Sequence, residues 1–198
     1  MKVIGLTGGI ASGKSTVSAY LKEKGIPVFD ADAAAWEVEK AGSPCLRQLV
    51  EVFGPAILTE KGELDRKEMA RLAFHDPAVL RQLNAIVHRA VEEKRDAFLA
   101  AHRQDPVVIL DAPLLLECGW EKVTDTVWLV YIPEEEQIRR AMARSGMTRE
   151  EVKDRIRKQL SLEEKRKQAQ VVLDNRGTLE DLYRQVDREL DRLSLSLP

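Results

Sequence analysis

A glycine-rich stretch from Gly8 to Thr16 follows directly after the apolar run Val3–Leu6. It fits the pattern G-x-x-x-x-G-K-[ST], in which backbone N–H groups surround phosphate oxygens and the next helix turns its positive N-terminal end to the same anion. The residues after it are helix-forming, so the pattern stands between an expected strand and an expected helix. A chance match in a glycine-rich turn is the alternative. The context favours a phosphate-binding loop.

Each residue type of this loop has its own task. Glycines occur where the chain must pass an oxygen without a side chain in the way. Lys14 is expected to reach the β- and γ-phosphates of ATP, and the Ser15 hydroxyl to be a ligand of Mg²⁺. The predicted ATP-binding residues of the loop are Gly8, Gly9, Ala11, Ser12, Gly13, Lys14, Ser15 and Thr16.

Composition and charge indicate which class of protein this is and which kind of partner it binds. Of 198 residues, 44% are hydrophobic and 32% are charged, as in a soluble globular protein. The net charge of -2 gives no general attraction to nucleic acid, so a small-molecule partner is expected. Cys45 and Cys118 form no C-x-x-C pair and are expected to be reduced, structural thiols. No apolar signal region or membrane span is found, which predicts a cytoplasmic protein without a membrane partner.

Short apolar runs alternate with longer helical patterns along the chain. This alternation predicts a five-stranded parallel sheet, and the nearly continuous apolar content of each run predicts that both faces of the sheet are covered. The expected fold is therefore α/β, with a three-layer α/β/α core. The expected strands are Lys2–Thr7, Val28–Phe29, Val107–Leu110, Val127–Ile132 and Val171–Leu173.

Two helical segments interrupt this core. Residues 33–104 carry little strand character, with Asp65 and Asp76 expected to open helices, and an insertion of this length is typical of a binding site. Residues 134–168 are polar, with capping-box patterns at Thr148 and Ser161, and are expected to form a lid over the nucleotide. We therefore expect one unit, 1–198, with its core in residues 1–32, 105–133 and 169–198.

Carboxylates follow two of the expected strands. Asp30 and Asp32 come after the second strand, and Asp32 is the candidate to accept the proton of an attacking hydroxyl. Asp111 ends the third strand, from which position it can approach Mg²⁺. The alternatives are helix capping by the aspartate pair and strand-end capping by Asp111.

Arginines of the expected lid and the absence of certain motifs limit the kinds of reaction that the chain can catalyse. Arg140 and Arg144 share a helical face, where they can close over the nucleotide or form ordinary solvated surface. Guanine-reading and transporter-ATPase motifs are absent from the sequence. A kinase acting on a small hydroxyl compound is favoured, with a nucleotide or nucleoside kinase, or an ATP-dependent binding module without turnover, as the alternatives.

The chain resembles the dephospho-coenzyme A kinase family nearly from end to end. Asp30–Asp32 and Asp111–Glu117 are the most particular matches, since the phosphate loop is shared among many kinases. The other matching residues are Leu6–Ile10, Gly62–Arg66 leading to Phe74, His88, Gln137, Arg140, Arg144, Arg155, Gln159, Glu164, Lys165, Asp174, Asn175 and Gly177.

The resemblance implies phosphorylation of the ribose 3′-hydroxyl of dephospho-CoA by ATP and Mg²⁺, the last step of coenzyme A biosynthesis. A monomer is expected, with an oligomer as the alternative. The resemblance also implies Lys14, Asp32 and Arg140 as catalytic residues, with Asp32 as the base. Arg144, Asn175 and Gly177 join the ATP site, and Ser15 and Asp111 the metal site. Acceptor binding is carried over to Asp32, His88, Asp111, Pro113, Leu114, Leu115 and Glu117.

Three residues depart from the family pattern. Ala11 stands where glycine is usual, which is tolerable with a negative φ. Arg89 replaces a usual proline after His88, which puts the local turn and the role of His88 in doubt. Gln170 replaces a usual acidic residue, and we expect it to alter a surface or hinge contact without affecting the chemistry.

Overall fold

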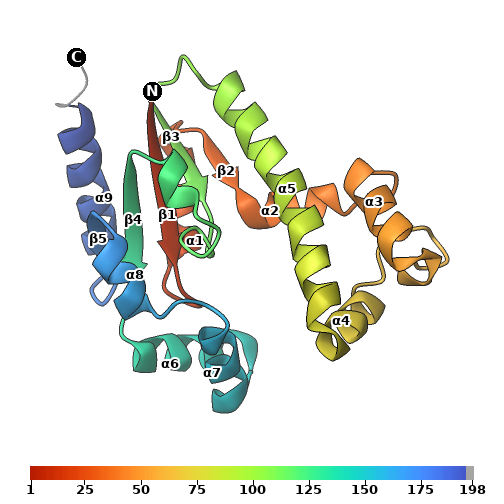
Figure 1. Cartoon of the computed structure of the whole chain (residues 1–198). Helices are drawn as coiled ribbons and strands as arrows, with labels where there is room; N and C mark the ends of the chain where they lie inside the picture. Colours follow the sequence, from red (N-terminus) through yellow and green to blue (C-terminus); the bar gives the residue numbers. More distant parts are fainter. Residues whose placement is uncertain (195–198) are drawn as a thin grey trace. The chain divides into compact units, whose positions relative to one another are not determined.

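The computed structural model describes residues 1–194, which form two compact units (Figure 1). The first unit comprises Met1–Phe29 and the described part of His102–Pro198, and the second comprises Asp30–Ala101. The second unit lies within three residues of the bounds 33–104 expected for the insertion. The difference arises because a helix begins directly after the second strand and the last helix of the unit ends at Ala101.

The first unit is built on a parallel sheet of five strands, in the order β2-β3-β1-β4-β5. The predicted α/β fold is confirmed, and every strand boundary falls within one residue of the expected one. The strands are β1 (Lys2–Gly8), β2 (Val28–Asp30), β3 (Val107–Asp111), β4 (Thr126–Tyr131) and β5 (Val171–Asp174).

The strand order places the phosphate loop at the centre of one sheet edge. β1 lies between β3 and β4, with Leu6 opposite both Asp111 and Trp128. Because parallel strands end at the same edge, Gly8 and Asp111 leave the sheet side by side. The loop and the carboxylate that follows β3 are therefore neighbours.

Helices α1 (Lys14–Glu23) and α9 (Leu179–Ser194) pack on one face of this sheet (Figure 1). They contribute Val17, Leu21, Leu182 and Val186 to a core with strand residues such as the fully buried Trp128. The connection between β3 and β4 includes the short helix η2 (Trp120–Val123). On the opposite face, Leu162 of α8 (Leu162–Gln168) packs on Leu129 and Ile132.

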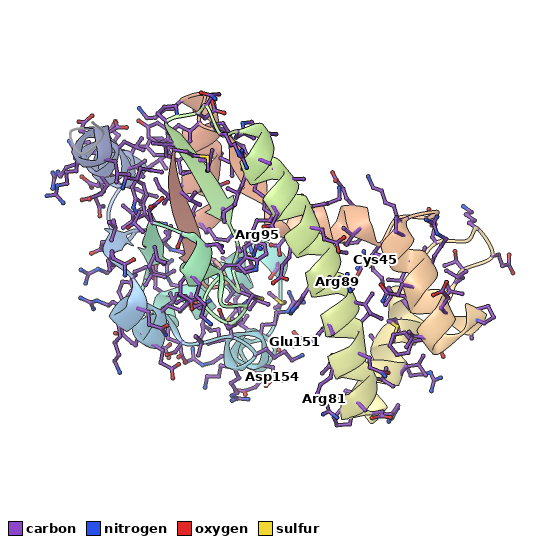
Figure 2. All side chains as sticks on the ribbon, turned by 45° about the horizontal axis from the view of Figure 1, so that its top comes forward. Cys45, Arg81, Arg89, Arg95, Glu151 and Asp154 are labelled. Carbon is purple, nitrogen blue, oxygen red and sulfur yellow. The ribbon has the colours of Figure 1, made fainter. Side chains whose placement is uncertain are left out.

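Residues 134–168 fold into α6 (Glu134–Ser145), α7 (Arg149–Arg157) and α8. Both expected capping boxes are present: the Thr148 side chain accepts from the Glu151 amide, and Ser161 does the same for Glu164. Figure 2 labels Glu151 in the first turn of α7. Ile138, Ala141 and Val152 form a small apolar cluster against which Ile10 and Ala11 of the phosphate loop pack.

The second unit consists of helices. They are α2 (Ala31–Val38), α3 (Pro44–Phe53), η1 (Pro55–Ile57), α4 (Arg66–His75) and α5 (Pro77–Ala101). Asp65 caps α4 through the amides of Lys67 and Glu68, and Asp76 binds the amide of Ala78 at the start of α5, as predicted. Within residues 1–194, no helix is long and apolar enough to cross a bilayer.

Candidate active site

Three glycines of the loop, Gly8, Gly9 and Gly13, have no room for a side chain, and a Cβ at Gly9 would lie 2.5 Å from Gln137 Oε1. A Cβ at Gly8 would lie 2.5 Å from Ser12 Oγ, and a Cβ at Gly13 would lie 2.1 Å from Asn175 Nδ2. Gly13 also has a φ of 98°, in the left-handed region that favours glycine. The loop is therefore a close-packed turn whose backbone, rather than its side chains, lines the inside.

Helix α1 begins in this turn with unpaired backbone donors. Gly13 is its N-cap residue, and no side chain among residues 1–194 caps it. The free N–H groups and the helix dipole favour an anion at this end. Ser12 is fully buried, and its Oγ has no hydrogen-bond partner in the described part of the chain. These features fit the phosphate group that the motif predicts.

Lys14 and Asp111 form an ion pair at the edge of the sheet. Lys14 Nζ donates to Asp111 Oδ1, and the two side chains are 16% and 4% exposed. The pair joins the phosphate loop after β1 to the carboxyl end of β3. The Lys14 ammonium therefore lies beside the loop. Since an ammonium forms charge-assisted hydrogen bonds with phosphate as well as with carboxylate, Lys14 could exchange Asp111 for a phosphate bound in the loop.

The arrangement also fits a magnesium ion. Mg²⁺ binds through one or two protein oxygens together with substrate phosphates and water. Asp111 offers a carboxylate beside the loop, and Ser15 is an exposed hydroxyl in the first turn of α1. Among residues 1–194 no three His, Cys, Asp or Glu side chains gather as a metal site of their own.

Arg140 is fixed beside the loop by two contacts. Its Nε donates to Glu136 Oε1 at 2.7 Å, and its Nη2 donates to the backbone oxygen of Asn175 at 2.9 Å. Asn175 Nδ2 in turn donates to the backbone oxygen of Ser12 at 2.7 Å. Hydrogen bonds from Arg139 and Arg140 hold the pKa of Glu136 at about 2. The predicted residues Arg140 and Asn175 are thus connected to the phosphate loop.

Two other predicted ATP-site residues are exposed. Arg144 lies in the last turn of α6, one turn after Arg140. Gly177 lies two residues after Asn175, and a Cβ there would lie 2.9 Å from Asp181 Oδ2. Within residues 1–194, no side-chain hydrogen bond or ion pair joins Arg144 or Gly177 to the phosphate loop.

The segment after β3 contains both buried and partly exposed side chains. Leu115 is fully buried and packs on Gly5 of β1, where a Cβ would lie 2.6 Å from Leu115 Cδ1. Pro113 and Leu114 are half-buried, and the carboxylate of Glu117 pairs with Lys165 Nζ at 2.9 Å. The side chain of Leu115 therefore belongs to the core, while Pro113 and Leu114 are open in part to solvent.

Asp32 and His88 belong to the second unit, and both are exposed. Asp30 is the N-cap of α2 and accepts a hydrogen bond from the Ala33 amide at 2.9 Å, so the capping alternative holds for Asp30. Asp32 lies in the first turn of the same helix. Helix α5 continues without a break through His88 and Arg89, so Arg89 introduces no turn there (Figure 2).

The expectation of a negative φ at Ala11 was wrong. Its φ is 55°, in the left-handed region that is strained for an L-residue. The methyl group is accommodated because it packs against the apolar cluster of α6 and α7. Gln170 joins two strands instead: its Oε1 accepts from the Val127 amide at 2.8 Å.

A sequence model of one family and a curated relative both match most of this chain. The sequence model of one family, described as dephospho-CoA kinase, matches residues 2–181. The chain belongs to the dephospho-CoA kinase family. A dephospho-CoA kinase of Shouchella clausii is 48% identical over 185 residues, covering 92% of this chain and 94% of the relative.

Solved structures share the fold of this chain. The crystal structure of TT1252 from Thermus thermophilus has a TM-score of 0.84 and 45% identity, and covers 97% of each chain. A dephospho-CoA kinase from Campylobacter jejuni shares the fold, with a TM-score of 0.74 and 24% identity over 99% of each chain. The chain is thus a kinase of the family that carries out the final step of coenzyme A biosynthesis.

Two contacts near the candidate site differ in how far the sequence could indicate them. Lys165 was noted as part of the resemblance, but nothing in its charged surroundings predicted that its side chain would be fully buried. Glu136 holds Arg140 from one turn earlier, an i,i+4 spacing that could have indicated the pair. Long-range contacts such as that of Lys165 are not visible in local patterns.

Proposed function

We propose that the chain transfers the γ-phosphoryl group of ATP to the ribose 3′-hydroxyl of dephospho-CoA, giving CoA and ADP. The observation that carries the proposal is the close-packed glycine loop at the open N-terminus of α1, with Lys14 and Asp111 beside it. This arrangement suits a triphosphate, and family membership supports the acceptor. The net charge of -2 gives no general attraction to nucleic acid. We also expect a cytoplasmic protein without a membrane partner, as a monomer, with an oligomer as the alternative.

The protein contributes mainly charge and position to this reaction. Lys14 exchanges Asp111 for the β- and γ-phosphate oxygens and stabilises the charge of the transferred group. Arg140, oriented by Glu136, and Arg144 approach the same phosphates from α6. Asn175 and Gly177 lie at the edge of the nucleotide site and contribute to the adenine pocket.

The acceptor hydroxyl needs a base and a binding surface. Asp32 accepts or orients its proton, while His88, Asp111 and the segment from Pro113 to Glu117 hold the rest of the acceptor. Ser15 and Asp111 would hold Mg²⁺, which supplies neutralisation of phosphate charge when bound. Transfer is direct and in line, without a phosphoenzyme.

An ADP-release assay with a panel of acceptors tests the proposal. Dephospho-CoA, adenosine, AMP and pantothenate are each supplied with Mg·ATP, and product fragmentation in a mass spectrometer locates the new phosphate. We expect rapid ADP release with dephospho-CoA alone and phosphate at the ribose 3′-oxygen. Turnover with another acceptor would favour a different small-molecule kinase, and no turnover at all would favour a binding module.

A further inference from the structure

Lys165 is a fully buried charge that the proposed chemistry leaves without a role. Its side chain is 0% exposed, although Glu164, Arg166 and Lys167 beside it on α8 are exposed. Burial lowers the pKa of its ammonium, and hydrogen bonding to Glu117 opposes that shift. A buried lysine is tolerated only where partners replace water. Its partners therefore indicate what it does.

Those partners lie in the segment that follows β3. Lys165 Nζ donates to the backbone oxygen of Pro113 and to Glu117 Oε2 at 3.2 Å. The Pro113 oxygen also accepts from Thr7 Oγ1 at 3.1 Å. Thr7 is fully buried in β1, immediately before the phosphate loop. One carbonyl group is thus held from two sides, by the sheet and by α8.

Glu117 is held in the same way by two parts of the lid. Its Oε1 accepts from the Leu160 amide at 2.8 Å, and Lys165 Nζ lies 2.9 Å from the same oxygen. Leu160 lies between α7 and α8. The carboxylate therefore connects the far end of the segment that starts at Pro113 to both sides of the α7–α8 junction.

From these contacts we infer that Lys165 and Glu117 are positioning residues, which fix the segment 113–117 in the conformation that binds the acceptor and anchor the C-terminal end of the lid to it. Both act through Pro113 and Leu114 rather than by touching substrate. This refines the expectation that Glu117 contacts the acceptor directly, and it rests on the proposed function.

The inference predicts a selective effect on the acceptor. Arg140 is held independently by Glu136 and the Asn175 carbonyl, so loss of the Lys165 contacts leaves these contacts of Arg140 in place. Misplacement of a binding segment by about 1 Å can cost about 100-fold in rate. The KM for dephospho-CoA should therefore rise while the affinity for ATP stays nearly constant.

The test compares Lys165→Met with Lys165→Arg, using Lys167→Met as a matched control on the exposed side of α8. For each variant we would measure kcat, both KM values, the Kd of an ATP analogue and Tm. We expect Lys165→Met to raise the KM for dephospho-CoA by about 10- to 100-fold, with the analogue Kd changed less than about twofold. Lys165→Arg should recover part of the loss, and Lys167→Met should match wild type.

A merely structural lysine would give a different pattern. Tm and the active fraction would fall while the KM for dephospho-CoA stayed within about twofold of wild type, and that result overturns the inference. If Lys165→Met does not fold, Thr7→Val and Glu117→Gln remove other contacts of the same network. Unchanged acceptor KM in both would overturn it as well. Wild-type turnover in the same assay separates these outcomes from failure of the proposed function itself.

Discussion

At the scale of single residues, Ala11 carries a strained backbone in the middle of the phosphate loop. Its φ of 55° costs an L-residue about 1–2 kcal/mol, which glycine avoids. The methyl group recovers part of this cost by packing against the apolar cluster of α6 and α7. The residue therefore exchanges loop strain for contact with the lid.

We predict that Ala11→Gly costs far less stability than a glycine placed in the middle of a helix. Relief of about 1–2 kcal/mol of strain offsets both the loss of about 0.4–1 kcal/mol from the greater freedom of glycine in the unfolded chain and the lost packing of the methyl group, so the free energy of unfolding should stay nearly constant or rise by less than about 1 kcal/mol. Urea unfolding measures the difference. The control is Ala19→Gly in the exposed middle of α1, which should destabilise by about 1 kcal/mol. Equal destabilisation by both variants would contradict the strain argument.

Asp30 and Asp32 offer a matched pair for the assignment of the base. Asp32→Asn should lower kcat by about 10²- to 10⁴-fold, the usual contribution of a general base, with ATP affinity nearly unchanged. Asp30→Asn should have a far smaller effect, because asparagine caps α2 as well as aspartate does. Steady-state kinetics with dephospho-CoA gives both values. Wild-type turnover in Asp32→Asn would show that another group takes the proton.

At the scale of elements, helices α7 and α8 of the proposed lid both start with a capping box. Hydrogen bonds from Thr148 lower the pKa of Glu151, and hydrogen bonds from Ser161 lower that of Glu164. A carboxyl whose pKa is lower in the folded state than in the unfolded chain binds its proton later as pH falls. Its stabilising contribution is present above the ordinary pKa of 4.5 and is lost as pH falls through the folded-state value.

The capping boxes therefore predict an acid-sensitive lid. The urea concentration at the unfolding midpoint of the wild type should decrease as the pH is lowered from about 5 to about 3. The double variant Glu151→Gln/Glu164→Gln should show a smaller decrease, because glutamine binds no proton at these positions. Urea unfolding at a series of pH values provides the comparison. Parallel pH profiles for the two proteins would mean that these carboxylates add nothing to the pH dependence.

Element boundaries could be predicted because their signals are local. Thr148 and Glu151 stand three residues apart, and Asp65 immediately precedes the helix it caps, so the sequence itself shows where the helices start. The strand order depends on pairing between distant segments and was not predicted. The same holds for Lys165, whose partners Pro113 and Glu117 lie 52 and 48 residues away. A charged residue among charged neighbours gives no local sign of burial.

At the scale of the whole molecule, the candidate site residues divide between the two compact units. The phosphate loop, Asp111, Arg140 and Asn175 belong to the first unit, and hydrogen bonds connect them to one another. Asp32 and His88 belong to the second unit. The proposed phosphate-binding residues could be predicted from the sequence because they lie in one motif, whereas the proposed acceptor residues lie in separate segments and were indicated mainly by the family resemblance.

The central claim is that the Gly8–Thr16 loop binds the triphosphate of ATP. A crystal structure with Mg²⁺, a non-hydrolysable ATP analogue and dephospho-CoA tests it most directly. We predict phosphate oxygens within hydrogen-bond distance of the loop amides and of Lys14 Nζ, with the Lys14–Asp111 pair separated. A triphosphate bound elsewhere, with Lys14 still on Asp111, would contradict the account.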